Sequence, residues 1–459
     1  MYICVCVCVY HNYIYIPPSS TRSIVVITIM ALKGVNILDF TRFQNGPAAT
    51  VMLADLGATV IKIEVPGVGD TGRGFGRVRS GFSGYFESLN RGKHSLELNL
   101  KHEKSRPILN KLIMWADVIT ENFKPRVLDR LGYGYEYCKS INPKIIYCAN
   151  SGFGNNGPWS KKGNERGSFD TISQSASGAM VASGGGPSHT PVHTPWGLAD
   201  QVGALNFTAQ ILAGIVARER HGVGQKIVCS QLGAMIQFQS TDIVPSMAAG
   251  RQRDDGEPSG FNNISLTFYK CGDGKWISVA PCVEESHYPK FCKAAGVEDL
   301  LTNERYATPA MRFKRENRIA FRQRLEKHFL TNTADYWVEK IAPVGVPIAP
   351  VLDYEGVRNH PQMRENGYIV EVDHPAWGKV STVGVMGQYS ETPAPPVGIA
   401  PDLGEHNDEI LEKIVHLNKN EIEALKKEGV ITPDPKKKYV PPGWMEKHKK
   451  KDRKMKSRL

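Results

Sequence analysis

The chain has 459 residues, of which 41% are hydrophobic and 22% charged, as expected for a globular protein of two or three domains. Its net charge of +11 is uneven, because residues 436–459 hold eleven Lys and Arg against Glu446 and Asp452, which leaves +2 for residues 1–435. No aromatic platform or nucleic-acid motif accompanies this basic end, so we expect a solvated, disordered tail and no nucleic-acid partner. Nine cysteines without CxxC spacing argue against a disulfide framework and a zinc site.

Residues 1–33 differ in character from everything that follows. The apolar runs of this leader are broken by His11 and by Pro17, so it is too interrupted for one membrane-spanning helix. It also lacks the basic start and the small-residue cleavage site of a secretory peptide. We predict that the leader is disordered or a gene-model extension, with Met30 as the working initiator, and we expect no membrane association.

A strand–helix–strand unit is predicted over 36–64. The run NILDF is typical of a strand buried on both faces, Pro47 suits the first position of a helix, Gly57 ends that helix, and TVIKIE is a second strand. Parallel strands joined in this way place a ligand site beyond their carboxyl ends. Here that place is 41–45, facing the free N-terminus of the helix, where a phosphate is favoured.

The same alternation continues along the chain. Strands over SLELNL, DVITENF and KIIYCANSGF alternate with helices over 102–115 and 125–131, and 170–181 and 198–220 are helix-like. From about Phe261 a β-hairpin and three helical segments follow, and a closing helix is predicted over 408–427. We therefore predict an α/β fold with a doubly wound, Rossmann-like parallel sheet in a large domain (34–255), a smaller α+β domain (256–380), a return to the large domain (381–430) and the basic tail (431–459).

Several motifs, in their order and spacing, resemble a known family. They are LDFTR-x-x-x-GP and LADLGA-x-VIK-x-E at the start, then SLNRGKHSLELNLK (88–101), ADVITENFKPRVLDRLG (116–132), NPKIIYCANSGFGNNGP (142–158) and GLADQVGALN (197–206). Over 34–429 the chain is similar to the type III CoA-transferases (CaiB/BaiF family), which include formyl-CoA transferase, succinate-hydroxymethylglutarate CoA-transferase and α-methylacyl-CoA racemase. The resemblance implies an interlocked homodimer and a coenzyme A thioester as substrate, with no permanently bound cofactor.

Asp200 is the predicted catalytic residue, because it matches the catalytic aspartate of that family. A carboxylate can attack a thioester to give a mixed anhydride, from which CoA passes to an incoming acid. The alternative role is a helix cap, and the two roles are compatible because a helix N-terminus is expected to stabilise the anion.

Phe169 and Asp170 occupy the place where racemases of the family carry a His-Asp pair. Racemisation needs a base on each face of the carbon, and Phe169 cannot titrate. This favours transfer over racemisation, with Asp170 as a surface acid or a helix cap.

The resemblance also implies a CoA-binding set of amides, backbone groups and cations. Val65 and Gly167 depart from the family, which has Arg and Lys there in some members, and Arg42, Arg73 or Arg91 could supply the missing charge. His94, His189 and His193 have no metal-ligand spacing, so no metal is predicted. The predicted set is Gln44, Asn45, Val65, Leu98, Asn99, Leu100, Lys101, Asn122, Phe123, Lys124, Arg130, Gly167, Ser168, Phe169 and Asp170.

Two glycine-rich stretches are open to more than one interpretation. The segment 184–186 lacks phosphate-loop spacing and is predicted to be a turn. The segment 256–260 is only a partial match to the glycine-rich lid of some formyl-CoA transferases.

The leading hypothesis is an acyl-CoA:carboxylate CoA-transferase acting on an acyl-CoA and a small carboxylic acid. The alternatives are a 2-methylacyl-CoA racemase and a non-catalytic CoA-binding protein. The C-terminal tripeptide Ser457, Arg458, Leu459 has the form of a peroxisomal address. Peroxisomal location is therefore predicted, with mitochondrial or cytoplasmic location as the alternative.

Overall fold

The computed structural model describes residues 29–76, 78–252, 254 and 267–432, and the backbone of two short paired strands, β1 (Val9–Tyr10) and β2 (Tyr13–Ile14). Most of the predicted leader, the segment 256–260, the basic tail beyond 432 and the C-terminal tripeptide lie outside the described residues.

The chain divides into two compact units. The large unit comprises the chain up to Ser177, Pro195–Ser240 and the chain from Arg364 on, and the small unit comprises Gly178–Thr194 and Thr241–Met363. The boundaries predicted from sequence place the small domain at 256–380. The structural division differs in two ways. It assigns the short segment Gly178–Thr194 to the small unit, and it assigns the β-hairpin that ends at Val383 to the large unit.

A parallel six-stranded sheet forms the centre of the large unit, in the order β10-β9-β8-β3-β4-β7. From β3 the chain adds β4 and β7 on one side, then β8, β9 and β10 on the other, which is the strand order of dinucleotide-binding folds. This confirms the predicted α/β class. The strands are β3 (Asn36–Asp39), β4 (Thr59–Glu64), β7 (His94–Glu97), β8 (Val118–Glu121), β9 (Ile146–Ser151) and β10 (Lys226–Ser230).

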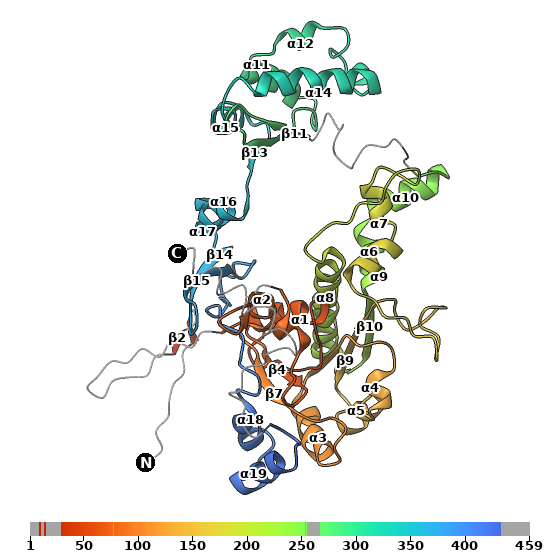
Figure 1. Cartoon of the computed structure of the whole chain (residues 1–459), viewed down its shortest axis with the longest axis vertical. Helices are drawn as coiled ribbons and strands as arrows, with labels where there is room; N and C mark the ends of the chain where they lie inside the picture. The colour runs from red at the N-terminus through yellow and green to blue at the C-terminus, as the bar shows by residue number, and fades with distance from the viewer. Residues whose placement is uncertain are drawn as a thin grey trace, which may run out of the picture. The chain divides into compact units, whose positions relative to one another are not determined.

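Helices cover the sheet on both faces because its strands are apolar on both faces. On β3, Ile37 belongs to the core shared with α1 and α8, whereas Leu38 belongs to the core shared with α3, α18 and α19. Figure 1 shows α1 and α8 on one side of the sheet and α3 and α18 on the other. The helices are α1 (Asn45–Asp55), α2 (Gly84–Asn90), α3 (Ser105–Trp115), α4 (Val127–Arg130), α5 (Tyr135–Ile141), α6 (Asp170–Ala176), α8 (Leu198–His221), α9 (Gln231–Phe238), α18 (Asn407–Lys413) and α19 (Lys419–Lys427).

Several predicted boundaries differ from the observed ones. Helix α1 begins at Asn45 rather than at Pro47. The helix predicted over 170–181 is interrupted at Gly178, which has a left-handed backbone (φ +84°), so that α6 ends and α7 (Ala179–Ser183) begins. The single closing helix predicted over 408–427 is two helices, α18 and α19. The connection between β4 and α2 contains a 3₁₀ turn, η1 (Thr71–Gly74), and two short paired strands, β5 (Val78–Arg79) and β6 (Phe82–Ser83).

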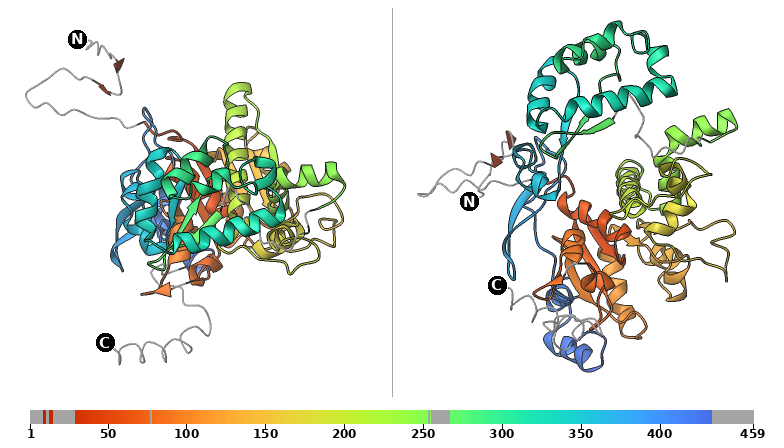
Figure 2. Two further views of the ribbon diagram at one scale, coloured as in Figure 1. Left: turned by 90° about the horizontal axis from the view of Figure 1, so that it is seen from above. Right: turned by 45° about the horizontal axis from the view of Figure 1, so that its top comes forward.

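The small unit has a core of its own, built from a three-stranded antiparallel sheet in the order β11-β12-β13 and the helices packed on it. Figure 2 shows the longer segment of this unit in green to teal. The elements of the small unit are α7, α10 (Ser240–Ala249), β11 (Thr267–Lys270), β12 (Trp276–Val279), α11 (His287–Ala295), α12 (Asp299–Thr302), α13 (Pro309–Arg312), α14 (Arg315–Phe329), α15 (Ala334–Ile341), η2 (Ala342–Val344), β13 (Ile348–Val351) and α16 (Tyr354–Asn359). The short helix α17 (Pro361–Glu365) and the hairpin of β14 (Ile369–His374) and β15 (Gly378–Val383) follow.

Candidate active site

Strands β3 and β8 are neighbours at the point where the strand order reverses, and the loops that follow them are the usual ligand site of such a sheet. Two hydrogen bonds hold these loops together. The Arg42 N–H donates to the Asn122 side chain at 2.8 Å, and Asn122 Nδ2 donates to the Arg42 carbonyl at 2.8 Å. Helix α1 begins against this loop only because residue 46 is Gly, since a Cβ there would collide with the side chain of Thr41.

Phe43 in the same loop has a left-handed backbone (φ +61°), which is uncommon for a bulky residue. Its N–H donates to Asp70 Oδ1 at 3.1 Å, which helps to hold this conformation. The Phe43 ring meets Phe169 edge-on, with ring centres 5.6 Å apart. Strained backbone of this kind is concentrated at functional sites.

Beneath the loop lies a cluster of buried ion pairs, which we call the paired cluster: Asp39, Lys62, Glu64, Asp70, Arg73 and Lys93. Lys62 Nζ lies 2.9 Å from Asp70 and Arg73 lies 2.6 Å from Glu64. Burial alone would raise the pKa of Asp39, but Lys93 and Lys62 hold it below its usual value. Against the same effect of burial, Arg73 and Lys62 lower the pKa of Glu64 to about 2. These charges are satisfied within the protein and form the frame of the site.

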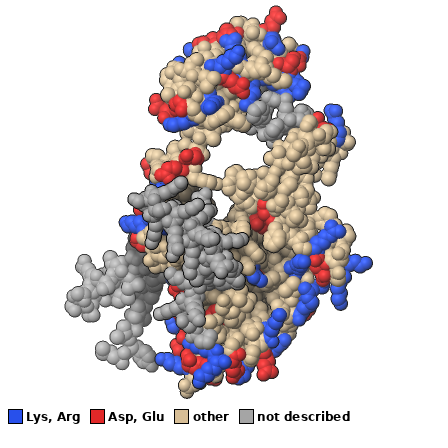
Figure 3. All heavy atoms as spheres, viewed as in Figure 1, with Lys and Arg blue, Asp and Glu red and all other residues tan. Residues whose placement is uncertain are grey.

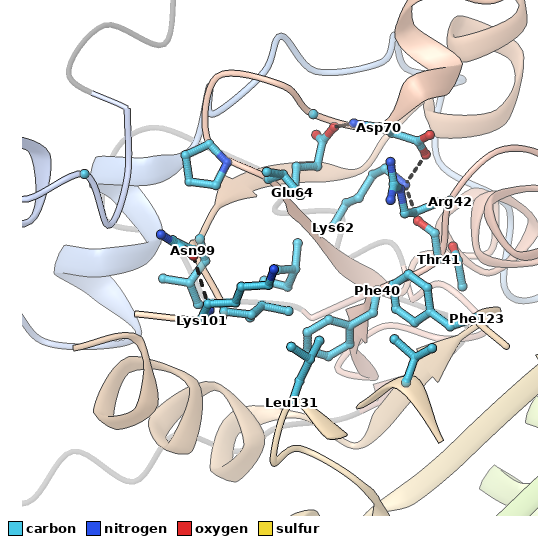
Figure 4. Close-up of a pocket in the computed structure, with 18 residues that line it drawn as sticks. Phe40, Thr41, Arg42, Lys62, Glu64, Asp70, Asn99, Lys101, Phe123 and Leu131 are labelled. Carbon is cyan, nitrogen blue, oxygen red and sulfur yellow. Dashed lines mark hydrogen bonds and ion pairs between the residues drawn. The ribbon is translucent and has the colours of Figure 1, made fainter. Parts of the chain in front are cut away.

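The larger of two pockets at this edge of the sheet has a volume of about 640 Å³. Figure 4 shows Phe40, Phe123 and Leu131 along one wall and Asn99 and Lys101 on another. Its lining follows strands β3, β4, β7 and β8 at their carboxyl ends. A pocket of this size, with an apolar wall and a few polar groups, suits a small organic ligand or cofactor.

A smaller pocket of about 240 Å³ contains Asp200 and shares Arg42 and Phe123 with the larger one. Within the described residues, no hydrogen bond or ion pair engages the side chains of Arg42, Lys101 and Lys124, which line the two pockets. Lys and Arg side chains are also prominent in Figure 3 on the side where α4 and α5 lie. The side chains of Arg42, Lys101 and Lys124 in the pockets are therefore available for an anionic ligand such as a phosphate.

Asp200 lies in the first turn of α8 and is held from two sides. Gln231, the first residue of α9, donates through Nε2 to Asp200 Oδ1, and Asn45 Nδ2 donates to the Asp200 carbonyl at 3.3 Å. Asn150 in turn donates to Asn45 Oδ1. Gly203 makes this possible, because a Cβ at that position would collide with the Asn45 amide.

Asp170 caps the helix that carries Asp200. Its Oδ1 accepts from the N–H of Ala199 at 2.7 Å and from the N–H of Asp200 at 3.4 Å, and its Oδ2 accepts from Gln174 at 2.8 Å. Of the two roles suggested by sequence for Asp170, the structure gives the helix cap, although the capped helix is α8 and not its own.

Asp200 itself is not the cap, because Asp170 accepts from the N–H groups of Ala199 and Asp200. The expectation that the N-terminus of α8 stabilises the Asp200 anion stays a prediction. Burial, followed by the nearby charge of Asp170, raises the pKa of Asp200 to about 7, and the hydrogen bond from Gln231 offsets part of this effect. A partly buried carboxyl with a raised pKa, in a pocket, is a candidate for chemistry.

The structure brings most of the predicted CoA-binding residues to the two pockets. Arg130 and Asp170 belong to neither lining, and the Arg130 side chain is exposed, 3.7 Å from Glu165. Val65, Leu98, Asn99, Leu100, Lys101 and Phe123 line the larger pocket. Gln44, Asn45, Asn122, Phe123, Lys124, Gly167, Ser168 and Phe169 line the smaller one.

Of the three arginines considered as replacements for the missing charge, only Arg42 lines the pockets. Arg73 is paired with Glu64, and Arg91 with Asp55. Sequence reasoning missed Gln231, Asn150 and Arg166 in the smaller pocket. Gln231 and Asn150 stand at the carboxyl ends of β10 and β9, so a search of every strand end would have found both.

Two further searches cover the described residues. In that part of the chain no three His, Cys, Asp or Glu side chains lie close enough together to hold a metal ion. Among the same residues, no helix combines the length and the apolar character needed to cross a bilayer.

A sheet of this strand order, with a partly buried carboxyl beside a ligand-sized pocket, is typical of an α/β enzyme, and comparison with known proteins identifies its family. The family model described as CoA-transferase family III matches residues 32–407. The chain belongs to this family and is an enzyme of the CoA-transferase type.

Curated relatives with related names cover most of the chain. It is 31% identical to a succinyl-CoA:glutarate CoA-transferase of Homo sapiens, over 88% of this chain and 90% of that protein. It is 31% identical to a formyl-CoA:oxalate CoA-transferase of Bradyrhizobium diazoefficiens, over 88% and 98%. It is 34% identical to an acetyl-CoA:oxalate CoA-transferase of Acetobacter aceti, over 74% and 85%.

Solved structures agree with this assignment. A CAIB/BAIF family protein from Brucella suis superposes with a TM-score of 0.73 and 28% identity, covering 84% of this chain and all of that one. The protein Rv3272 from Mycobacterium tuberculosis gives a TM-score of 0.70 and 26% identity, covering 83% of this chain and 99% of that one.

Proposed function

We propose that the protein transfers CoA from an acyl-CoA to a small carboxylic acid, with Asp200 as the nucleophile. The observation that carries the proposal is the position of Asp200, in a small pocket that shares Arg42 and Phe123 with a pocket of about 640 Å³. The larger pocket suits the body of CoA, and the smaller one suits the thioester and the acid. The names of the relatives reported above each pair an acyl-CoA with a carboxylic acid, which supports the proposed type of reaction.

The proposed reaction passes through a covalent enzyme intermediate. The Asp200 carboxylate attacks the thioester carbonyl, the C–S bond breaks, and a mixed anhydride and CoA thiolate result. The thiolate attacks Cγ of Asp200 and releases the donor acid, which leaves an aspartyl thioester. The acceptor carboxylate then attacks Cγ, the Cγ–S bond breaks, and a second mixed anhydride and CoA thiolate result. The thiolate attacks the acceptor's acyl carbon in this anhydride, which gives the new acyl-CoA and releases Asp200 as a carboxylate.

The raised pKa of Asp200 makes this chemistry dependent on pH. Only the ionised carboxylate attacks, so the rate should rise with pH through about 7 and then level off. A mildly basic carboxylate is also a better nucleophile than one of ordinary pKa.

A racemase is the second candidate, and the site argues against it. Racemisation needs two bases around the α-carbon. Phe169 offers none, and Asp170 is engaged with the N–H groups of α8. We expect no exchange of the α-proton of a 2-methylacyl-CoA in heavy water at a useful rate, and fast exchange would favour the racemase.

We also propose that the chain forms a homodimer, interlocked as the family resemblance implies. Apolar side chains on the large unit are exposed in the single chain, including Leu205 on α8, Ile236 and Phe238 on α9, and Ile172 on α6. Exposed apolar surface of this extent is typical of a protein interface. Light scattering on the purified protein tests this, and a monomer at micromolar concentration would contradict it.

The location that we propose is the peroxisome, on the basis of Ser457, Arg458 and Leu459, which follow the pattern of the S-K-L signal. A fusion with its fluorescent tag at the N-terminus should reach peroxisomes, and removal of the last three residues should release it to the cytosol. A diffuse full-length fusion would contradict the proposal, as would mitochondrial import when the native N-terminus is free.

Mass spectrometry of the protein incubated with acyl-CoA tests the transfer mechanism. An adduct is expected on the Asp200 peptide, convertible to a hydroxamate by hydroxylamine. Asp200→Ala should lose at least three orders of magnitude in kcat, as is usual for a covalent nucleophile, and should still bind CoA. Full activity in this variant would end the proposal, whereas CoA binding without adduct or transfer in the wild type would favour a non-catalytic CoA-binding protein.

A further inference from the structure

The side chain of Gln231 donates a hydrogen bond to Oδ1 of Asp200, and this contact points to a role in catalysis. We infer that its side-chain amide is an oxyanion donor, which stabilises negative charge on Oδ1 of Asp200 each time Cγ of that residue is attacked, and leaves Oδ2 as the attacking oxygen. The inference rests on the proposed function, since it assigns the two oxygens of the proposed nucleophile.

The backbone fixes the position of Gln231. It directly follows β10, whose last residue, Ser230, pairs in register with Ser151 of β9 and caps α9 by accepting from the Gly233 N–H at 3.0 Å. The next residue, Leu232, donates its N–H to the Gly152 carbonyl at 3.0 Å. Gln231 is therefore held at a strand end and a helix start together, and only 5% of its surface is exposed.

The orientation of the amide is fixed as well. Ser173, fully buried, donates its hydroxyl to Gln231 Oε1 at 3.1 Å, and Ser168 Oγ lies 2.8 Å from Ser173 Oγ. An ionised carboxylate only accepts hydrogen bonds, so the NH₂ end of the amide must face Asp200 and the oxygen end must face Ser173. Because the NH₂ group of Gln231 already faces Asp200, the amide does not have to rotate when the reaction begins.

This geometry meets a requirement of the chemistry. When thiolate attacks Cγ, the electron pair of the Cγ=Oδ1 bond moves to Oδ1, and it returns as the Cγ–Oδ2 bond breaks and the donor acid leaves with Oδ2. When the acceptor carboxylate attacks Cγ, the charge again develops on Oδ1 and returns as the Cγ–S bond breaks. A preset N–H at Oδ1 therefore acts in both attacks on Cγ, and a donor of this kind is worth about 10²–10³ in kcat.

The surroundings of Asp200 make this donor important. Within the described residues no Lys or Arg pairs with the Asp200 carboxylate, and the N–H groups at the start of α8 are bound to Asp170. Gln231 is the group that offsets part of the rise in the pKa of Asp200. Removing the amide should therefore impair catalysis and also move the acid limb of the pH profile upward.

Two substitutions test the inference on the full-length enzyme. Gln231→Leu removes the donor at similar volume, and Gln231→Glu keeps the shape and the acceptor for Ser173 but has no donor when ionised. Both should lower kcat about 10²–10³-fold. The KM for acyl-CoA should stay within about twofold, because the amide acts on the transition states. The acid limb of the kcat/KM profile should move to higher pH in both variants.

The matched control is Gln239→Leu, which removes an amide from the end of the same helix. Gln239 donates to the carbonyls of Ser177 and Met235 and does not contact Asp200, so the kcat and the pH profile of this variant should match those of the wild type. Melting temperature and CoA binding report on folding. If the Leu variant does not fold, the isosteric Glu variant decides by the same criteria.

The outcomes separate this inference from the proposed function. Suppose that Asp200→Ala abolishes transfer but both Gln231 variants keep kcat within about threefold of the wild type, or change only the KM. The oxyanion role of Gln231 is then wrong, and the proposal that Asp200 is the nucleophile is unaffected. If Asp200→Ala keeps its activity, the proposed function fails first. An equal loss of kcat in Gln239→Leu would assign the effect to helix α9 and would also overturn the inference.

Discussion

Two groups of carboxylates lie at the carboxyl ends of one sheet, and their surroundings shift their pKa values in opposite directions. In the paired cluster, Asp39 and Glu64 face lysines and an arginine, and the pKa of each is lowered. Asp200 has an amide and a second acid as neighbours, and its pKa is raised to about 7. Loss of contact with water raises the pKa in both groups, so the neighbouring charges decide the direction of the net shift. The paired carboxylates hold the loops of the site, and the unpaired one is free to react.

The largest expected effect comes from breaking the paired cluster. Lys62→Met should lower the free energy of unfolding by about 3–5 kcal/mol, because it leaves Asp70 buried without its cation. Urea denaturation measures this, and Asp70→Asn in the same chain should recover part of the loss. If the free energy of unfolding of Lys62→Met is within about 1 kcal/mol of the wild-type value, the paired cluster does not stabilise the loops of the site.

A smaller effect of opposite sign is expected at Asp200. Its pKa is raised in the folded protein, so folding disfavours the carboxylate: the cost is absent below the ordinary pKa of 3.8, grows as the pH rises toward 7, and is constant above that. Asp200→Asn should therefore be more stable than the wild type at pH 8, by ~1–4 kcal/mol, and equal to it near pH 4. Thermal unfolding at both pH values tests this, and an equal or less stable variant at pH 8 would contradict the assigned pKa.

The smallest effect is expected from a substitution that displaces Asp200 and leaves its charge and its neighbouring charges unchanged. Gly203→Ala places a methyl group against the Asn45 amide, which bonds to the Asp200 carbonyl. We expect a stability loss of about 1 kcal/mol and a fall in kcat of about tenfold, since small displacements of a reacting group are costly. Steady-state kinetics and melting curves measure both. Unchanged kcat would mean that Asn45 does not position Asp200.

Much of the large unit follows from local sequence. The apolar runs that end in Asp39, Glu64 and Glu121 are strands because they are apolar on both faces, and Gly57 ends α1 with a left-handed backbone. Boundaries were harder to predict, because they depend on contacts distant in sequence. Gly178 ends α6 at the boundary between the two units, and no local pattern marks that boundary.

The candidate site was predicted in part for the same reason. Asp200 was found through its motif, and the loops at 98–101 and 122–124 through the family pattern. A helix cap was one of the two roles predicted for Asp170, but the helix that it caps could not be predicted, because the cap joins residues thirty positions apart on two helices. Gln231 could have been selected as a residue at a strand end, but its contact with Asp200 could not be predicted, because the position of β10 beside β9 is defined only by the assembled sheet.

The closing helices α18 and α19 affect the order in which the chain folds. Their side chains, including Ile410, Leu411 and Ile422, belong to the same core cluster as Leu38 of the first strand of the sheet. Contacts of such long sequence separation slow folding, and during synthesis this core stays incomplete until residue 431 has left the ribosome. The small unit has its own core within 267–348 and can form earlier. A nascent chain stopped before α18 should therefore expose one apolar face of the sheet to chaperones, although Asp200 and the loops after β3 and β8 have already been synthesised.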